Sequence, residues 1–283
     1  MQIKKVGVVG AGVMGAGIAQ VCAQSGYQTV VSEINQQLLD KGLGTIKTSL
    51  AKSVEKGKLT QSDMEATLAR LKGTLNTQDF KDCDLMIEAA IENMELKKKL
   101  FADLDKICPP QTILGTNTSA LSVTEIAMAT KRPEKVAGIH FFNPPSLMKL
   151  VELVITIVTS NETIDTIKAF GQSIGKTVVL AKDAPGFIVN RLFVPYLLDS
   201  IRMLEANYAT KEDIDQAAKL GLNYPMGPLE LSDLIGLDTL HFVASVMYEE
   251  YKDPKFVSPV LLKKMVAAGQ LGRKTGKGFY EYK

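Results

Sequence analysis

The chain has 283 residues, of which 46% are hydrophobic and 23% charged. This length exceeds the usual size of one domain, so we expect two domains, each with its own apolar core. The 33 basic and 31 acidic residues leave a net charge of +2 and form neither a polybasic arm nor an acidic tail, so the composition predicts no nucleic acid partner.

The cysteines and the apolar runs indicate the cellular compartment in which the protein is expected. Cys22, Cys83 and Cys108 are odd in number and far apart, which fits neither a disulfide framework nor a zinc site, so we expect buried, reduced thiols and no metal. No apolar run reaches the ~18 residues of a membrane span, and the first predicted strand begins almost at Met1, which leaves no room for a signal peptide. The sequence therefore predicts a cytoplasmic protein that does not bind membranes.

The first predicted element is a strand that runs into a glycine-rich turn. Gly10, Gly12 and Gly15 fit the pattern G-x-G-x-x-G after the apolar residues 6–9, and residues 16–23 have the spacing of a helix. In such a unit the first glycine permits the turn, the second lets the backbone approach a pyrophosphate, and the third brings helix and strand together. The helix start adds N–H groups and the positive end of the helix dipole. The turn therefore predicts a dinucleotide site.

An acidic residue ends the second predicted strand, residues 28–33. Glu33 lies about 20 residues after the turn, where the ribose-binding acid of a dinucleotide site is found. A carboxylate at this position accepts hydrogen bonds from the ribose hydroxyls and repels a 2′-phosphate, which favours NAD over NADP. The alternative is a glycine-rich turn in another kind of α/β protein, followed by a surface glutamate.

Two helices are predicted next, over residues 36–58 and 62–72. Thr60 and Asp63 have the spacing of a capping box at the start of the second helix. Lys52 and Lys56 are four residues apart, so they share one face of the first helix. Taken alone, this stretch indicates only a solvated basic face.

Buried strands are then predicted at residues 84–90, 112–119 and 135–143, with a helix at 95–107. Strands that alternate with helices predict a Rossmann-type, doubly wound and mainly parallel sheet, whose ligands lie beyond the carboxyl ends of the strands. Polar residues gather at these predicted strand ends, namely Glu33, Glu92, Asn117, Ser119, His140 and Asn143.

The pattern changes in the last third of the chain. A strand at 149–158, a helix at 161–174 and a strand at 177–181 come first. Beyond residue 184 the spacing predicts only helices, at residues 187–207, 211–220, 229–235, 239–251 and 258–268. We therefore expect a Rossmann-type domain over residues 1–184 and a smaller all-helical domain over residues 185–283.

The two histidines have different surroundings. His241 lies in an apolar helical pattern and is expected to be structural, whereas His140 lies at a strand end on the predicted dinucleotide edge. Oxidation of an alcohol by a nicotinamide needs a base, and imidazole titrates in the right range. Glu152 interrupts an apolar strand, so it needs a partner. That partner is either His140, which it would orient, or a lysine such as Lys149, because strand register cannot be read from the sequence.

Several separated motifs resemble the L-3-hydroxyacyl-CoA dehydrogenase family. They are the turn at residues 10–20, Glu88-Ala-Ala-Ile-Glu92-Asn, Asn117-Thr-Ser119, His140-Phe-Phe-Asn143-Pro-Pro, Pro185-Gly-Phe-Ile-Val-Asn190-Arg, Pro225-Met-Gly-Pro228 and Gly272-Arg-Lys274-Thr-Gly-Lys-Gly-Phe279-Tyr. The resemblance covers essentially the whole chain. It is strongest to the short, stand-alone bacterial members that act on 3-hydroxybutyryl-CoA.

The resemblance implies roles for individual residues. His140 matches the general base and Glu152 its orienting carboxylate, while Ser119 and Asn190 match residues that hold the substrate. Lys52 and Lys56 match positions that receive the phosphates of coenzyme A. The implied cofactor contacts are Gly10, Gly12, Val13, Met14, Gly15, Glu33, Glu92, Lys97, Asn117, Ser119, Asn143 and Lys274. The family more often has aspartate at the position of Glu33.

The implied reaction is reversible hydride transfer between NAD(H) and a short-chain L-3-hydroxyacyl-CoA and 3-ketoacyl-CoA pair, with 3-hydroxybutyryl-CoA and acetoacetyl-CoA expected. The resemblance also implies a homodimer formed through the helical domain. Because Asn190 lies beyond the predicted boundary, both domains are expected to complete the site. The alternatives are a sugar-acid dehydrogenase of the wider family and a non-catalytic dinucleotide-binding protein. The sequence leaves open the acyl-chain length that the enzyme prefers and the physiological direction of the reaction. It also leaves open whether the pathway is four-carbon fermentation or fatty-acid breakdown.

Overall fold

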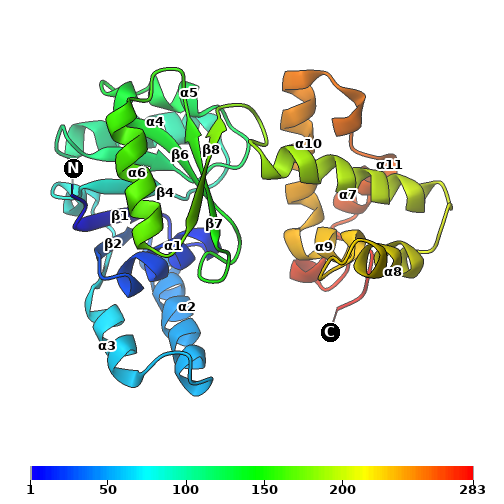
Figure 1. Cartoon of the computed structure of the whole chain (residues 1–283), viewed down its shortest axis with the longest axis horizontal. Coiled ribbons are helices and arrows are strands. Elements are labelled where there is room, and N and C mark those ends of the chain that lie inside the picture. The colour runs from blue at the N-terminus through cyan, green and yellow to red at the C-terminus, as the bar shows by residue number, and fades with distance from the viewer. Residues whose placement is uncertain (1, 283) are drawn as a thin grey trace. The chain divides into compact units, whose positions relative to one another are not determined.

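The computed structural model describes residues 2–282 (Figure 1). Internal contacts divide the chain into two units, Met1–Asp183 and Ala184–Lys283, which we describe separately. The outer limits of the two predicted domains, residues 1 and 283, lie outside the described residues.

One sheet forms the centre of the first unit. Within the described residues it has eight strands in the order β3-β2-β1-β4-β5-β6-β7-β8. Neighbours from β3 to β6 are parallel, β7 is antiparallel to β6, and β8 is parallel to β7. The strands are β1 (Lys5–Val9), β2 (Gln28–Ser32), β3 (Leu71–Thr74), β4 (Leu85–Glu88), β5 (Ile113–Thr116), β6 (Val136–Phe141), β7 (Leu150–Ile155) and β8 (Thr177–Lys182). The predicted Rossmann-type, mainly parallel fold is confirmed.

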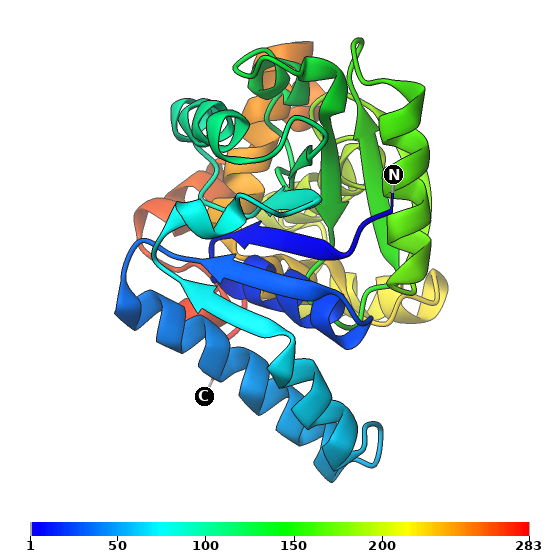
Figure 2. The same ribbon diagram turned by 90° about the vertical axis from the view of Figure 1, so that its left-hand side faces the viewer.

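Helices cover the sheet on both sides. They are α1 (Val13–Gln24), α2 (Gln36–Glu55), α3 (Gln61–Ala69), α4 (Met94–Ile107), α5 (Val123–Ala127) and α6 (Asn161–Ser173). The chain runs outward from β1 to β2 and in the opposite direction from β4 to β5, so right-handed crossovers place α1 and α4 on opposite faces. Helices α2 and α3 pack together and project from the sheet as a pair (Figure 2).

Local sequence explains where these helices begin. Asn35, Asn93 and Ser160 each accept a hydrogen bond from a backbone N–H of the first helical turn, which satisfies a donor that the helix itself cannot. The predicted capping box of Thr60 and Asp63 at the start of α3 is confirmed.

One part of the prediction was wrong. The helix expected over residues 62–72 ends at Ala69, and Leu71–Thr74 form strand β3 at the edge of the sheet. Only Thr74 of this short strand is buried, so its side chains show no alternation of apolar and polar residues. Pairing with β2 decides the strand, and a single-sequence pattern does not report that pairing.

The second unit is helical. Its α-helices are α7 (Val189–Glu205), α8 (Lys211–Gly221), α9 (Pro228–Ile235), α10 (Leu237–Tyr251) and α11 (Val260–Ala267). Leu197, Leu229 and Met247 lie in its buried interior. The helical prediction for this part of the chain is confirmed. In residues 2–282, none of the helices combines the length and apolarity needed to cross a membrane.

Candidate active site

The glycine-rich turn has the shape that a dinucleotide needs. Gly10 has a φ of +94°, in the left-handed region that favours glycine. A Cβ atom at Gly15 would lie 1.9 Å from the carbonyl oxygen of Gly10, so the helix packs directly on the turn. A Cβ atom at Gly12 would meet nothing within 4 Å, so this face of the turn is open to a ligand.

The start of α1 adds donors to that open face. Gly12 caps the helix without a side-chain hydrogen bond among the described residues. Helix geometry leaves the N–H groups of Val13, Met14 and Gly15 without an intrahelical acceptor, and they point toward the positive end of the helix dipole. The residues therefore fit a bound pyrophosphate.

Glu33 is fixed beside the turn. Its Oε1 atom accepts a hydrogen bond from Ala11 N at 2.8 Å, and its Oε2 atom accepts one from Ile34 N at 3.0 Å. The carboxylate thus has a defined direction, and it places a negative charge between the carboxyl ends of β1 and β2. This charge lies where the ribose of a dinucleotide is expected.

A buried charge cluster lies beyond β4. The Lys97 ammonium is 1% exposed and lies 2.6 Å from Oε1 of Glu88 and 3.2 Å from Oε2 of Glu92. Glu88 is fully buried and also accepts hydrogen bonds from the hydroxyl of Thr116 and from Ala90 N, both at 2.7 Å. Sequence reasoning missed Glu88, although a charged residue inside an apolar strand gave the same signal as Glu152.

Glu92 connects this cluster to the segment after β5. Its Oε1 atom accepts hydrogen bonds from Ser119 N at 2.7 Å and from the Thr118 hydroxyl at 2.9 Å. Asn117 holds the same segment from the other side, because its Oδ1 atom accepts a hydrogen bond from Phe141 N at 2.9 Å. These contacts fix the backbone of Ser119 next to the end of β6.

Strand register decides the partner of Glu152. In the antiparallel pair of β6 and β7, His140 and Glu152 lie directly opposite each other. His140 Nδ1 lies 2.7 Å from Glu152 Oε2, and both side chains are buried, His140 at 4% exposure and Glu152 at 0%. An ionised carboxylate can only accept, so Nδ1 carries a proton, and in the neutral imidazole Nε2 is then the nitrogen with the acceptor lone pair.

The basic nitrogen of His140 faces a hydroxyl. Nε2 lies 3.1 Å from Oγ of Ser119, and the ring packs against Phe142 with 4.7 Å between centroids. The imidazole is thus oriented by a carboxylate on one side and meets a small polar group on the other. This arrangement can take a proton from an alcohol and return it.

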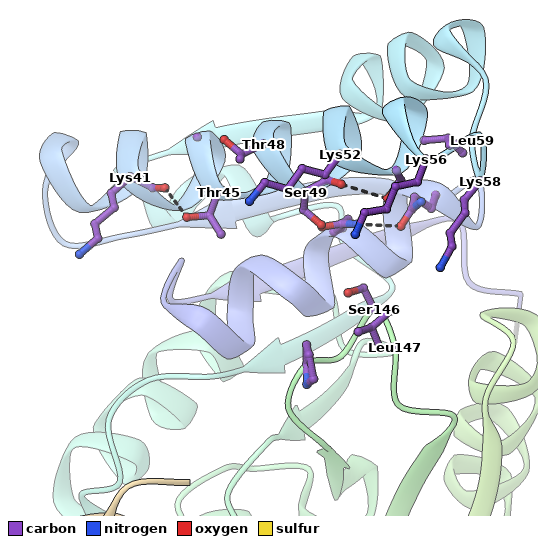
Figure 3. Close-up of a pocket in the computed structure, with 15 residues that line it drawn as sticks. Lys41, Thr45, Thr48, Ser49, Lys52, Lys56, Lys58, Leu59, Ser146 and Leu147 are labelled. Carbon is purple, nitrogen blue, oxygen red and sulfur yellow. Dashed lines mark hydrogen bonds between the residues drawn. The ribbon is translucent and has the colours of Figure 1, made fainter. Parts of the chain in front are cut away.

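The lysines of α2 line a groove of about 840 Å³ in the same unit (Figure 3). Lys41 and Lys52 lie on one face of α2, Lys56 is the residue at its C-cap, and Lys58 follows two residues later. Pro144, Ser146 and Leu147, from the loop after β6, line the groove as well. None of the described residues that line it carries a carboxylate.

Asn143 lies in this loop and is exposed. Asn190 and Lys274 belong to the second unit, where Asn190 lies in the first turn of α7 and the Lys274 ammonium lies 2.5 Å from Asp238. Because the units are described separately, the assignment of these two residues to the site stays a prediction.

The cysteines and His241 do not take part in these arrangements. Cys22, Cys83 and Cys108 are buried and free, and burial raises the pKa of Cys22 and Cys83 to about 12. His241 Nδ1 lies 2.8 Å from Ser258 Oγ, and burial lowers its pKa. No group of three histidine, cysteine or acidic side chains within the described part of the chain could hold a metal ion.

Comparison with known proteins extends this description to the whole chain. The model of the 3-hydroxyacyl-CoA dehydrogenase NAD binding domain matches residues 5–184, and that of the C-terminal domain matches residues 186–282. A 3-hydroxybutyryl-CoA dehydrogenase of Mycobacterium tuberculosis is 47% identical over 282 residues, which cover 99% of each chain. A 3-hydroxybutyryl-CoA dehydrogenase of Clostridioides difficile is 46% identical over 98% of this chain and 99% of its own.

Solved structures agree with these relatives. The crystal structure of M. tuberculosis FadB2 superposes with a TM-score of 0.99 at 46% identity, and that of (S)-3-hydroxybutyryl-CoA dehydrogenase PaaH1 from Ralstonia eutropha with 0.95 at 44% identity. Each comparison covers 100% of both chains. The chain, an NAD-dependent oxidoreductase, therefore belongs to the 3-hydroxyacyl-CoA dehydrogenase family.

Proposed function

We propose that this enzyme transfers hydride reversibly between NAD(H) and a short-chain L-3-hydroxyacyl-CoA and 3-ketoacyl-CoA pair, with 3-hydroxybutyryl-CoA and acetoacetyl-CoA as its substrates. The observation that carries the proposal is His140, held between Glu152 and Ser119 at the same carboxyl edge of the sheet as the glycine-rich turn. The full-length relatives named 3-hydroxybutyryl-CoA dehydrogenase support the choice of the four-carbon substrate.

His140 acts as the general base of the proposed oxidation. Its Nε2 atom takes the proton of the substrate hydroxyl, and Glu152 stabilises the imidazolium that results. Ser119 Oγ, close to Nε2, holds the substrate oxygen in line with the base. Bound NAD supplies the hydride acceptor. In the reducing direction the protonated His140 returns its proton to the same oxygen.

The proposed cofactor is NAD in preference to NADP. The Glu33 carboxylate, fixed by Ala11 N and Ile34 N, repels a 2′-phosphate and accepts from ribose hydroxyls. Further proposed cofactor contacts are Glu92, Lys97, Asn117, Asn143 and Lys274. Since Lys97 is 1% exposed, its ammonium acts largely by fixing Glu92.

The groove beside α2 is the proposed site of the coenzyme A moiety. Lys52 and Lys56 offer two compact cations to its phosphates, and no carboxylate among the described lining residues opposes them. A sugar acid has no distant phosphate, so these lysines favour the acyl-CoA over that alternative substrate.

The helical unit is the proposed dimer interface and supplies Asn190 to the substrate. Large apolar side chains are exposed on it, Leu192, Leu220 and Val260 among them. Association with a second copy through this surface removes apolar area from water. Sedimentation should therefore give twice the mass of one chain.

Steady-state kinetics test the proposed function. The purified enzyme should oxidise NADH with acetoacetyl-CoA, and NADPH should be a far poorer reductant. Glu33→Ala should narrow the difference between the two cofactors. Absence of turnover with a series of 3-ketoacyl-CoAs, while NADH still binds, would favour the non-catalytic alternative and overturn the proposal.

A further inference from the structure

A buried lysine outside the catalytic residues anchors the loop that lines the groove. Lys176 lies between α6 and β8 and is 9% exposed. Its ammonium donates hydrogen bonds to the carbonyl oxygens of Pro145 at 2.6 Å and Met148 at 2.7 Å. Burial lowers its pKa, so a charged amine at this position needs these two acceptors.

The loop, residues 142–149, is a compact turn around these contacts. The Pro144 carbonyl accepts from the N–H groups of Leu147 and Met148, both at 3.0 Å. Thr177, the neighbour of Lys176, donates its N–H to the Lys149 carbonyl at 2.7 Å. The loop is thus held from inside the fold, while its tip stays outside.

A second contact packs the loop against α1. A Cβ atom at Gly17 of α1 would lie 2.7 Å from the Pro145 ring, so the ring packs directly on the helix backbone. Ser146 and Leu147 then lie across the groove from Lys56 and Lys58 (Figure 3). Leu147 is 71% exposed, which makes it an apolar surface available to a ligand in the groove.

We propose that Lys176 is a positioning residue for the acyl-CoA, which acts through the loop of residues 142–149. It holds Ser146 and Leu147 as one wall of the groove, and the lysines of α2 form the other. The inference rests on the proposed function, because it assumes that coenzyme A occupies the groove. Lys176 itself touches neither substrate nor cofactor in this account.

The test compares two thioesters that share the acetoacetyl group. Acetoacetyl-CoA reaches the groove, whereas the N-acetylcysteamine thioester lacks the nucleotide and does not. In Lys176→Met we expect the KM for acetoacetyl-CoA to rise about tenfold, because binding must then order the loop that Lys176 no longer holds. The KM for the short thioester, the kcat for both and the Kd for NADH should change less than about twofold.

Further variants keep the test decisive. Lys176→Arg should keep the KM for acetoacetyl-CoA close to that of wild type, since guanidinium also donates hydrogen bonds to carbonyls. Gly17→Ala, which displaces the Pro145 ring, should give the same split between thioesters even if Lys176→Met does not fold. Lys168→Met removes an exposed lysine of α6 and serves as the control without effect.

Ionic strength separates this role from phosphate binding. The KM effect of Lys176→Met should be independent of salt, whereas that of Lys52→Ala should shrink as salt increases. The inference is overturned if KM rises equally for both thioesters, or if KM does not rise in either Lys176→Met or Gly17→Ala. The proposed function still stands in that case, provided that the wild-type enzyme turns over. Absence of wild-type turnover overturns the proposed function itself.

Discussion

The carboxyl edge of the sheet and the groove beside α2 place polar groups in opposite ways. At the edge, His140 and Glu152 are buried and paired, and strand register sets their geometry. In the groove, Lys52 and Lys56 are exposed, and only the spacing of one helix sets their positions. The first arrangement suits chemistry that needs a fixed proton position, and the second suits capture of a mobile, charged group.

The difference predicts distinct kinetic signatures. Changes at the edge should lower kcat and be insensitive to salt, because buried groups are poorly screened. Changes in the groove should raise the KM for the acyl-CoA and depend on salt.

Removal of the base should have the largest effect. We expect His140→Gln to lower kcat by about 10³-fold, within the usual range for loss of a general acid–base. NADH binding should stay close to wild type, since the glycine-rich turn and Glu33 are unchanged. Stopped-flow turnover and NADH fluorescence titration provide the two measurements. A variant that keeps more than about a tenth of wild-type kcat contradicts the proposed mechanism.

Loss of the orienting carboxylate should have a smaller effect on kcat and an added effect on stability. In Glu152→Gln the amide no longer fixes the proton on Nδ1 or stabilises the imidazolium, so kcat should fall about 10²-fold. Disruption of the buried hydrogen bond should also lower the free energy of unfolding by about 1–3 kcal/mol. Denaturant unfolding beside kinetics separates the two effects. Wild-type kcat in a correctly folded variant contradicts the orienting role.

Loss of the groove lysines should affect binding alone. In Lys52→Ala with Lys56→Ala we expect the KM for acetoacetyl-CoA to rise about tenfold at low salt and the difference to shrink as salt increases. The kcat should stay near wild type. Lys47→Ala is the matched control, because Lys47 is also exposed on α2 but is not among the described residues that line the groove. An unchanged KM in the double variant removes the reason to place coenzyme A there.

The same division explains what the sequence could predict. Lys52 and Lys56 share a face because helix periodicity is local, and the glycine pattern of residues 10–15 is local as well. The partner of Glu152 stayed open between His140 and Lys149, since it depends on the register of β6 and β7. Strand β3 was missed because pairing with β2, and not its own pattern, makes it a strand.

Residues that act through buried contacts were the hardest to predict. Glu88 of β4 pairs with Lys97 of α4, and Lys176 binds two backbone carbonyls more than 25 residues away in the chain. Neither contact follows from a spacing rule. A charged residue inside an apolar strand is a usable signal for Glu88, whereas Lys176 follows a glycine at a turn and resembles any surface lysine in sequence.

The smallest expected effect concerns His241, which belongs to α10 of the helical unit. Burial and the charge of Lys263 lower the pKa of His241 in the folded protein. Below a pH of about 6.5, the usual pKa of histidine, the unfolded chain therefore binds more protons than the folded one. Stability should therefore fall as pH falls below about 6.5, and His241→Asn should flatten this dependence.

Thermal unfolding of wild type and His241→Asn across this pH range measures the effect. The kcat of the variant near neutral pH should equal that of wild type. Equal slopes in the two proteins would show that another group is responsible.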